Sequence, residues 1–417
     1  MPQPQSRLRQ TATRNTRQQD LRILIILSAL MSFASVSTDL YLPAMPTITR
    51  ELHAAAGSIE FTLSGFLIGF SLGQLIWGPV GDRFGRRLPI ALGLVLFIIG
   101  SAGCALSATM VQMVFWRVVQ ALGACAGPVL ARAMVRDLYA RERSAQMLST
   151  LILFMAVAPL LGPIIGGQIM TIGSWHNIFW VMVALGFVAL YGVWQLPESL
   201  SAEQRSQEPF SRVFANYAEL LRNGRVMGFA LTSSFYYCSF YAFIAGTPFA
   251  YIDFYHVSPQ LYGLLFGVNV LGIMSTNFFN GRLIARFGSE KLFYIGAVIA
   301  AVAGSLLGIN AYFGWGGLAG LAIPFFIFAS MNGFIVANAV AGALAAAQHN
   351  AGACSSLVGA MQYGSGILSA SLVGWLADGT PWPMGAIIAL MALLCSLAAI
   401  GMRQHGKGQR QGCDISS

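Results

Sequence analysis

Charged residues are scarce in this chain of 417 residues: only 9% are Asp, Glu, Lys or Arg, whereas 56% are hydrophobic. A soluble globular domain has about 25% charged residues, so the composition excludes a conventional soluble protein. Cysteine and histidine are also rare. The six cysteines are scattered singly and the five histidines lie near predicted loops and helix ends. This distribution excludes a disulfide framework and predicts no metal site.

Long apolar runs fill most of the chain. A helix that spans a bilayer needs about 20 mainly apolar residues, and runs of this kind occur in two sets of six. The sequence therefore predicts an all-α integral membrane protein with twelve transmembrane helices in two pseudo-symmetric six-helix bundles. The predicted spans lie near residues 22–44, 58–80, 88–107, 111–134, 145–168 and 175–196, and then near 225–250, 259–285, 290–311, 316–345, 352–377 and 383–402.

The hydrophilic stretches between these runs define the domains. All 24 Lys and Arg residues except Arg50 and Arg117 fall in segments that would share one side of the membrane. The positive-inside rule places that side, with both termini, in the cytoplasm. The net charge of +9 reflects this topology, so no nucleic-acid partner is expected. The predicted order is a disordered cytoplasmic tail (1–20), an N-terminal bundle (21–196), a cytoplasmic linker with a short surface helix near 210–221 (197–224), a C-terminal bundle (225–403) and a cytoplasmic tail (404–417).

A charged, glycine-rich turn with the sequence GPVGDRFGRR occupies residues 78–87. It cannot lie in lipid, and it predicts a tight polar connection between two helices. A weaker copy at 281–288 has Ala285 in place of the acid, which indicates the duplicated halves typical of transporters. A contact between Asp82 and Arg136 in one conformational state would make the turn a cytoplasmic gate; the alternative is a plain turn with topogenic arginines. The predicted gate residues are Gly78, Asp82, Arg83, Gly85, Arg86, Arg87 and Arg136.

Asp39 and Arg117 are the two charges that fall clearly inside predicted spans. Counting 1.5 Å per residue, both lie roughly 8–9 Å below the outer boundary of the hydrocarbon core. Such residues normally face a partner, water or the bundle interior. Their matching depth and opposite sign predict a pair, direct or through water. The pair either locks two helices statically or, in the interpretation we favour, lets the carboxylate load and release a proton.

Residues 158–167 combine prolines with glycines inside the fifth span. Proline kinks a helix and small residues four apart permit close crossing, so we expect a bend and a tight interface between the halves at Pro159, Gly162, Pro163, Gly166 and Gly167. Other polar and aromatic side chains inside the spans are candidates for lining a central cavity, with interhelical packing as the alternative. They are Tyr41, Phe154, Tyr237, Tyr241, Asn269, Asn332 and Gln362.

These motifs together resemble those of the major facilitator superfamily, and in particular its twelve-span drug:proton antiporters of the Bcr/CflA group. Residues 78–87 match the signature between helices 2 and 3, and 117–123 (RVVQALG) is similar to the helix 4 motif with Ala121 in place of a glycine. Residues 162–167 (GPIIGG) match the end of the helix 5 antiporter motif. Residues 37–46 (STDLYLPAMP) and 247–252 (TPFAYI) are similar to segments of helices 1 and 7 in the Bcr/CflA group.

The resemblance implies export of drugs or small amphiphilic compounds in exchange for protons, with Asp39, Arg117 and Gln120 at the coupling site. Bicyclomycin- or chloramphenicol-like compounds are the expected kind of substrate. It also implies a monomer in the bacterial inner membrane that uses the proton gradient and no cofactor. Two alternatives stay open: a proton-coupled transporter of an amino acid, peptide or sugar, and a membrane-embedded enzyme. The enzyme would need clustered carboxylates or a nucleophile–base set, which this sequence lacks.

Overall fold

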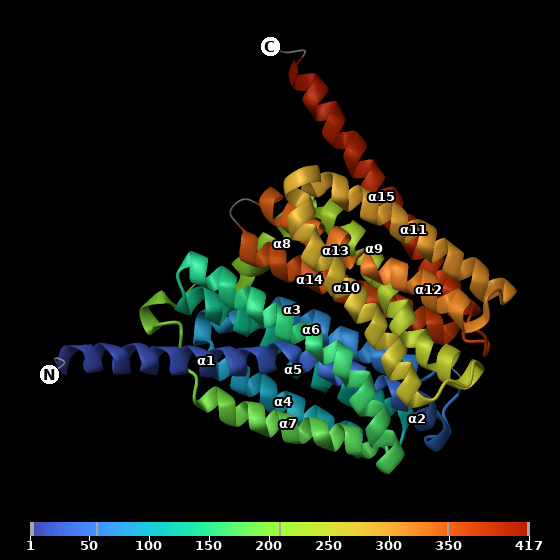
Figure 1. The fold of residues 1–417 in the computed structure, drawn as a ribbon, viewed down its shortest axis with the longest axis horizontal. Helices are drawn as coiled ribbons and strands as arrows, with labels where there is room; N and C mark the ends of the chain where they lie inside the picture. Colours follow the sequence, from blue (N-terminus) through green and yellow to red (C-terminus); the bar gives the residue numbers. More distant parts are fainter. Residues whose placement is uncertain (1–3, 56, 208–209, 348–349, 415–417) are drawn as a thin grey trace.

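The computed structural model describes residues 4–55, 57–207, 210–347 and 350–414, and within these ranges every regular element is helical. Two bundles lie side by side (Figure 1). The first contains α1 (Pro4–Asp39), α3 (Glu60–Phe84), α4 (Arg87–Ala105), α5 (Met110–Leu138), α6 (Arg141–Ile172) and α7 (His176–Trp194). The second contains α9 (Gly224–Thr247), α10 (Pro259–Phe287), α11 (Ser289–Phe313), α12 (Gly317–Ser330) continued by α13 (Asn332–Ala346), α14 (Ala351–Trp375) and α15 (Trp382–Asp414).

Each predicted span coincides with one of these helices, or with the α12–α13 pair. In the described part of the chain, nine segments are long and apolar enough to cross a membrane. The other three spans are α6, α9 and α14, whose 32, 24 and 25 residues also suffice at 1.5 Å per residue. Of these, α6 and α14 pack across to the opposite bundle, against α10 and α3. Their polar and small residues therefore lie against protein rather than lipid.

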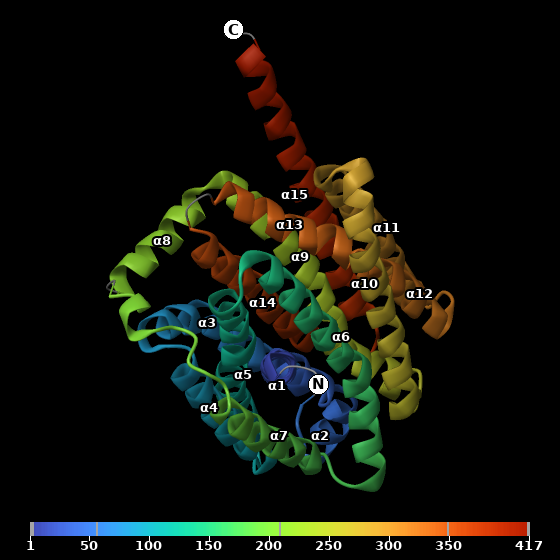
Figure 2. The ribbon, with the colours of Figure 1, turned by 60° about the vertical axis from the view of Figure 1, so that its left-hand side comes forward.

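Short elements connect the long helices. The first span continues past α1 through a 3-10 turn, η1 (Leu42–Ala44), into α2 (Met45–Glu51), and a π-helical segment, η3 (Pro248–Phe254), follows α9. The connection between the bundles holds the turn η2 (Ala202–Gln204) and α8 (Phe210–Arg222), which lies along the side of the molecule (Figure 2). The surface helix predicted near 210–221 coincides with α8.

Residues 1–20 were predicted to be a disordered tail, and this stays a prediction. Residues 1–3 lie outside the described residues, and the structure draws residues 4–20 as the start of α1, which begins at Pro4. Once a transmembrane helix is formed, each added residue needs only propagation rather than nucleation, and Arg, Gln and Leu are good helix formers. At the other terminus α15 continues to Asp414 and projects from the bundle (Figure 1).

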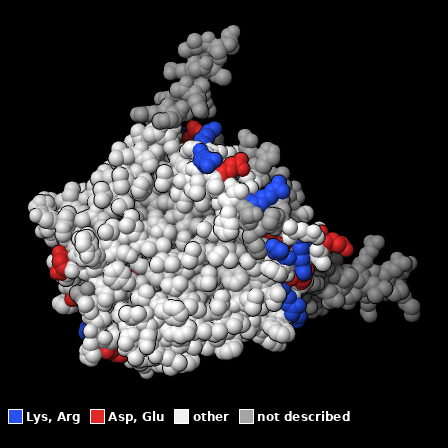
Figure 3. All heavy atoms as spheres, turned by 180° about the vertical axis from the view of Figure 1, so that it is seen from behind, with Lys and Arg blue, Asp and Glu red and all other residues white. Residues whose placement is uncertain are grey.

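The surface separates apolar and charged regions as a bilayer requires. Figure 3 shows a broad belt almost free of Lys, Arg, Asp and Glu, with charges gathered at the two ends of the helices. Large exposed side chains such as Val188, Leu264 and Val302 lie in the apolar helices. The end that holds the turn at 78–87, the connection at 195–224 and the start of α14 is called the arginine-rich end below.

Contacts between the bundles are closest at the end opposite the arginine-rich end. Gly57 and Gly374 bring two backbones so close together that neither position has space for a Cβ. Arg50 and Asp253 form an exposed ion pair across the bundles at 3.9 Å. At the arginine-rich end, by contrast, a cavity of about 320 Å³ opens between α3, α5, α8 and α14. The two bundles are therefore in close contact at one end and enclose a cavity at the other.

Candidate functional site

Asp39 is the last residue of α1 and is almost completely buried, with 4% of its surface exposed. Its Oδ1 accepts a hydrogen bond from the neighbouring Thr38 hydroxyl at 3.2 Å. Helix α6 lies directly against it, because a Cβ added at Gly162 would come within 2.7 Å of Asp39 Cβ. A side chain at residue 162 would push the two helices apart. The glycine of the predicted helix 5 motif thus allows α6 to cover the acid.

Asp39 faces the opposite bundle. It lies within electrostatic range of Tyr241 on α9, Tyr262 on α10 and Tyr363 on α14. The rings of Tyr241 and Tyr363 are 6.0 Å apart and both contact Tyr237, with centroid distances of 6.0 and 6.1 Å. An acid of the first bundle therefore lies within electrostatic range of tyrosines from three helices of the second.

Arg117 lies inside its own bundle and is fully buried. Its Nη1 donates to the carbonyl oxygen of Ser37 at 2.9 Å and to Oε1 of Gln120 at 2.7 Å. The guanidinium carbon lies 4.6 Å from the ring centroid of Tyr41 and 4.5 Å from that of Phe66. Nε and Nη2 have no hydrogen-bond partner in the described part of the chain. Aromatic rings stabilise this cation by cation–π contact, while two of its donors stay unused.

The pair predicted between Asp39 and Arg117 is not formed directly: among the described residues, no ion pair joins them. The reason is orientation. Arg117 reaches α1 through the carbonyl of Ser37, whereas Asp39 follows two residues later, at the end of the helix. Residues two apart on a helix do not share a face. The depth estimate placed both charges near each other, but it could not give the direction in which each side chain points.

The remaining glycines of the predicted helix 5 motif make close contacts on both sides of α6. A Cβ at Gly166 would clash with the carbonyl of Leu40, the residue after α1, and one at Gly167 would lie 3.0 Å from the Pro259 carbonyl oxygen of α10. Pro159 and Pro163 lie inside the helix, and Pro163 borders Gly263 of α10. The motif therefore joins α6 to Asp39 as well as to the opposite bundle, where the sequence predicted only the second interface.

Six of the seven predicted cavity residues separate into three groups. Tyr237 and Tyr241 lie between the bundles in the tyrosine group, and Gln362 is buried with an unpartnered Nε2 in the described part of the chain. Tyr41 is fully buried under Arg117, and its hydroxyl contacts Thr62 Oγ1 at 2.6 Å, so it packs inside one bundle. Two amides are occupied by packing: Asn269 donates to the Leu265 carbonyl of its own helix, and Asn332 contacts Tyr236.

Phe154, a candidate for the cavity with packing as the alternative, lies on an exposed face of α6. It is 49% exposed and shares that face of α6 with Val157, Leu161 and Ile165, which are also exposed. This spacing of three and four residues is that of a single helix face. Sequence identified an aromatic side chain at the right depth, but not the side of the helix on which it lies.

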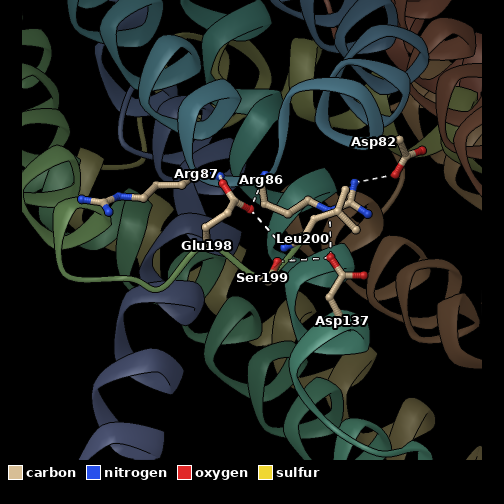
Figure 4. Close-up of polar contacts among 7 residues, drawn as sticks. All are labelled: Asp82, Arg86, Arg87, Asp137, Glu198, Ser199 and Leu200. Atoms are coloured by element: carbon tan, nitrogen blue, oxygen red, sulfur yellow. Dashed lines mark hydrogen bonds and ion pairs between the residues drawn. The ribbon is translucent and has the colours of Figure 1, made fainter. Parts of the chain in front are cut away.

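At the arginine-rich end, Arg86 is the centre of a polar network (Figure 4). Its Nη1 donates to Asp82 Oδ1 at 2.5 Å and its Nε donates to Asp137 Oδ2 at 2.8 Å. Glu198 accepts hydrogen bonds from the backbone N–H groups of Arg86 at 2.8 Å and Arg87 at 3.2 Å. Burial alone would lower the pKa of Arg86, but its bonds to Asp137 and Asp82 and the charges of both carboxylates raise it above the ordinary value.

The expected contact between Asp82 and Arg136 is absent from this network; Asp82 bonds Arg86 instead. The partners lie four residues apart, across the turn after α3, where the chain reverses at Gly85 with a φ of +90°. Arg83 and Arg136 line the nearby cavity, and Gly78 faces Ser356 of the other bundle. In this conformation the motif at 78–87 is thus held within the first bundle, and one glycine touches the second.

Comparison with known proteins agrees with this arrangement. The family described as Major Facilitator Superfamily matches residues 25–257, more than half of the chain. The chain belongs to the major facilitator superfamily. An uncharacterized MFS-type transporter, YdgK, of Bacillus subtilis is 35% identical over 94% of this chain and 98% of its own length. A bicyclomycin resistance protein homolog of Haemophilus influenzae is 31% identical over 89% and 94%. A solved structure of the nucleoside transporter NupG shares the fold, with a TM-score of 0.74 at 15% identity over 92% and 99%.

The relatives named for drug resistance confirm the resemblance to the Bcr/CflA group. As a member of the superfamily, the chain is a multi-span transporter rather than an enzyme. Of the acids in the polar network around Arg86, the sequence pointed to Asp82 but not to Asp137 or Glu198. Glu198 was not singled out because it stands alone in the connection after α7, and only the fold brings it to the turn at 85–87. Burial would raise its pKa, but backbone N–H groups of Arg86, Leu200 and Arg87, with the charge of Arg205, hold the pKa below its usual value.

Proposed function

We propose that this chain exports drug-like amphiphilic compounds from the cytoplasm in exchange for protons, by alternating access. The bicyclomycin resistance homolog, similar over nearly its whole length, supports a drug as the substrate. Bicyclomycin- or chloramphenicol-like compounds are the first candidates. The arginine-rich end would face the cytoplasm of a bacterial inner membrane, since cytoplasmic segments carry the excess of Lys and Arg. The proton gradient would supply the energy, with no cofactor, to a monomer.

The observation that carries this proposal is the position of Asp39. It is a buried carboxyl group on one bundle within electrostatic range of tyrosines of the other. An ionised carboxylate is costly in apolar surroundings unless it has partners, and Thr38 is its hydrogen-bond donor here. A proton or a hydrogen-bond donor of the substrate would each satisfy it. Competition between these two occupants is the requirement for exchange.

The contacts between the bundles support alternating access. One end is closed by the backbone approach of Gly57 and Gly374 and by the exposed pair of Arg50 and Asp253. The other end has the cavity bordered by α3, α5, α8 and α14. Rocking of one bundle against the other about the α3–α14 and α6–α10 seams would open the first end and close the second. The network around Arg86 would then stabilise one of the two arrangements.

The proposed function is tested in a bacterial strain that lacks its main efflux pumps. Expression of the wild-type chain should raise resistance to some members of a panel that includes chloramphenicol, bicyclomycin and ethidium. A protonophore should restore accumulation of the exported compound. The Asp39→Asn variant, matched for membrane abundance by immunoblot, should give no resistance. Unchanged susceptibility to the whole panel by well-expressed wild-type protein would argue against drug export.

A further inference from the structure

The cavity at the arginine-rich end has an unusual balance of charge. Among its described lining residues, one carboxylate, Asp82, stands against four arginines: Arg83, Arg86, Arg132 and Arg136. Asp82 is already paired with Arg86. Because low-dielectric walls focus the field of like charges, the inside of this cavity attracts anions. Its volume of about 320 Å³ is at the lower end of the range for small-molecule sites, roughly 300–1,000 Å³.

Two arginines of α5, Arg132 and Arg136, line the cavity, and Arg132 lies farther from the C-terminal end of the helix. It is partly buried, and its Nε donates to the Pro128 carbonyl of its own helix at 2.7 Å. That bond uses Nε and none of the terminal N–H groups, and Arg132 is one of the residues that line the cavity. No carboxylate pairs with Arg132 in the described part of the chain. A guanidinium offers two parallel N–H donors suited to a carboxylate, sulfonate or phosphate group.

The surroundings of Arg132 combine aromatic rings with the positive charge of Arg136. Arg132 lies within electrostatic range of Tyr237 and Tyr363, and the Tyr363 ring packs on Phe70 with centroids 4.3 Å apart. The cavity lining also includes neutral polar side chains, namely Asn216, Tyr217, Asn350, Ser355 and Ser356. A molecule with one anionic group and an aromatic body would therefore find a cation, aromatic surface and neutral hydrogen-bonding groups in one cavity.

We propose that this cavity binds substrates that carry an anionic group on an aromatic or apolar body, with Arg132 as the partner of that group. This inference rests on the proposed export function and extends it to the chemical class of the substrate. Arg136, four residues along the same helix and exposed, attracts the anion toward the opening, and Arg132 then holds it. Rocking of the bundles carries the anion past the tyrosine group toward the opposite end. A purely topogenic arginine at residue 132 would influence orientation in the membrane but not the choice of substrate.

The test is binding of fluorescein, an aromatic anion, to the full-length protein purified in a neutral detergent, followed by fluorescence anisotropy. Wild-type protein should bind fluorescein, and inorganic phosphate should compete. Arg132→Gln should weaken binding by at least about 10-fold, the effect of losing a charged hydrogen bond. Arg132→Lys should retain part of the affinity. Arg282→Gln is the matched control, because Arg282 is exposed on α10 over the Phe278 ring and lies outside the cavity.

A transport assay distinguishes between the possible ligands of the cavity. In proteoliposomes of phosphatidylcholine with an imposed proton gradient, wild-type protein should move fluorescein and Arg132→Gln should not, while both move chloramphenicol. Equal fluorescein affinity in wild type and Arg132→Gln would overturn the inference. If phosphatidylglycerol displaces fluorescein through Arg132 and no fluorescein is transported, the site belongs to a lipid headgroup and the inference is wrong. Export of chloramphenicol without fluorescein binding would reject this inference alone; transport of neither would reject the proposed function.

Discussion

Gly162 of α6 lies against Asp39 of α1 so closely that a Cβ on residue 162 would be 2.7 Å from Asp39 Cβ. This contact joins the helix 5 motif to the buried acid within one bundle. It also explains why a glycine is needed there, since real side chains do not approach each other to that distance. The covering of Asp39 by α6 thus depends on a residue that has no side chain.

The Gly162→Ala variant should therefore lose both stability and transport. Overpacking of a closely packed interior costs about 1–3 kcal/mol, and the displaced α6 would uncover Asp39. The melting temperature in detergent and efflux at equal abundance measure the two effects. Gly281→Ala is the control, because a Cβ at that position of α10 meets nothing within 4 Å. It should be neutral or slightly stabilising, since Ala favours a helix by up to about 1 kcal/mol over Gly. Equal behaviour of the two variants would contradict the contact.

Replacement of Arg117 separates its packing from its charge. Arg117→Ala removes a fully buried side chain between the rings of Tyr41 and Phe66 and leaves the Ser37 carbonyl and Gln120 without their donor. We expect a loss of about 3 kcal/mol or more. Arg117→Met fills most of the volume without charge, so it should recover much of the melting temperature.

The informative measurement is transport by the Arg117→Met variant. If the guanidinium takes part in coupling, this stable variant stays inactive in proton-driven efflux. Recovery of stability together with wild-type efflux would reduce Arg117 to a packing residue that holds α5 to α1.

The sequence was sufficient for the parts of the fold that depend on local properties. Apolar runs located the spans, because length and hydropathy within one segment decide whether it crosses a bilayer. The glycines of 162–167 marked a close helix crossing for a similar reason: only small side chains permit it. The turn at 78–87 was recognisable by its charges, which cannot lie in lipid.

The partners of individual side chains could not be predicted in this way. Asp39 and Arg117 were predicted at matching depth, but Arg117 bonds the Ser37 carbonyl and no ion pair joins it to Asp39 in the described part of the chain, and Phe154 lies on an exposed face of α6. Rotation of each helix about its axis decides these contacts, and that rotation is set by packing against all neighbours at once. Glu198 illustrates the same limit, because two of its backbone donors, Arg86 and Arg87, come from a segment more than 100 residues earlier.

Asp82→Asn keeps an oxygen that accepts the bond from Arg86 and should leave abundance nearly unchanged. Its charge is lost, however, and we expect impaired transport through a shifted balance between the two conformations. A change of about 1–2 kcal/mol alters their populations by roughly 5–30-fold. Labelling of a single cysteine introduced at Ser356, in the cavity wall, reports the shift. Wild-type labelling and wild-type export would make the turn at 78–87 a topological feature only.

The lowered pKa of Glu198 predicts that part of the stability of the fold is lost on acidification. Its backbone hydrogen bonds hold the pKa in the folded protein below the ordinary 4.5, so the ionised group stabilises the fold above that pH. This contribution is lost as the pH falls through the lowered pKa. Glu198→Gln should therefore be less stable than wild type at about pH 6, and the difference between the two melting temperatures should shrink on acidification below about 4.5. A difference that is constant from about pH 6 to about pH 3 would show that the charge of Glu198 does not contribute.

Asp39 gives the most direct test of proton exchange. If substrate and proton compete for this carboxyl group, addition of an exported compound to detergent-purified protein in weak buffer should release protons, as a pH indicator dye would record. Asp39→Asn should release none and should fail in active efflux, although a neutral compound can still bind. The variant preserves the size of the side chain and its contact with Gly162, so the melting temperature should stay near that of wild type. Proton release and efflux that persist undiminished in Asp39→Asn would remove this residue from the coupling mechanism and leave it a packing role beneath α6.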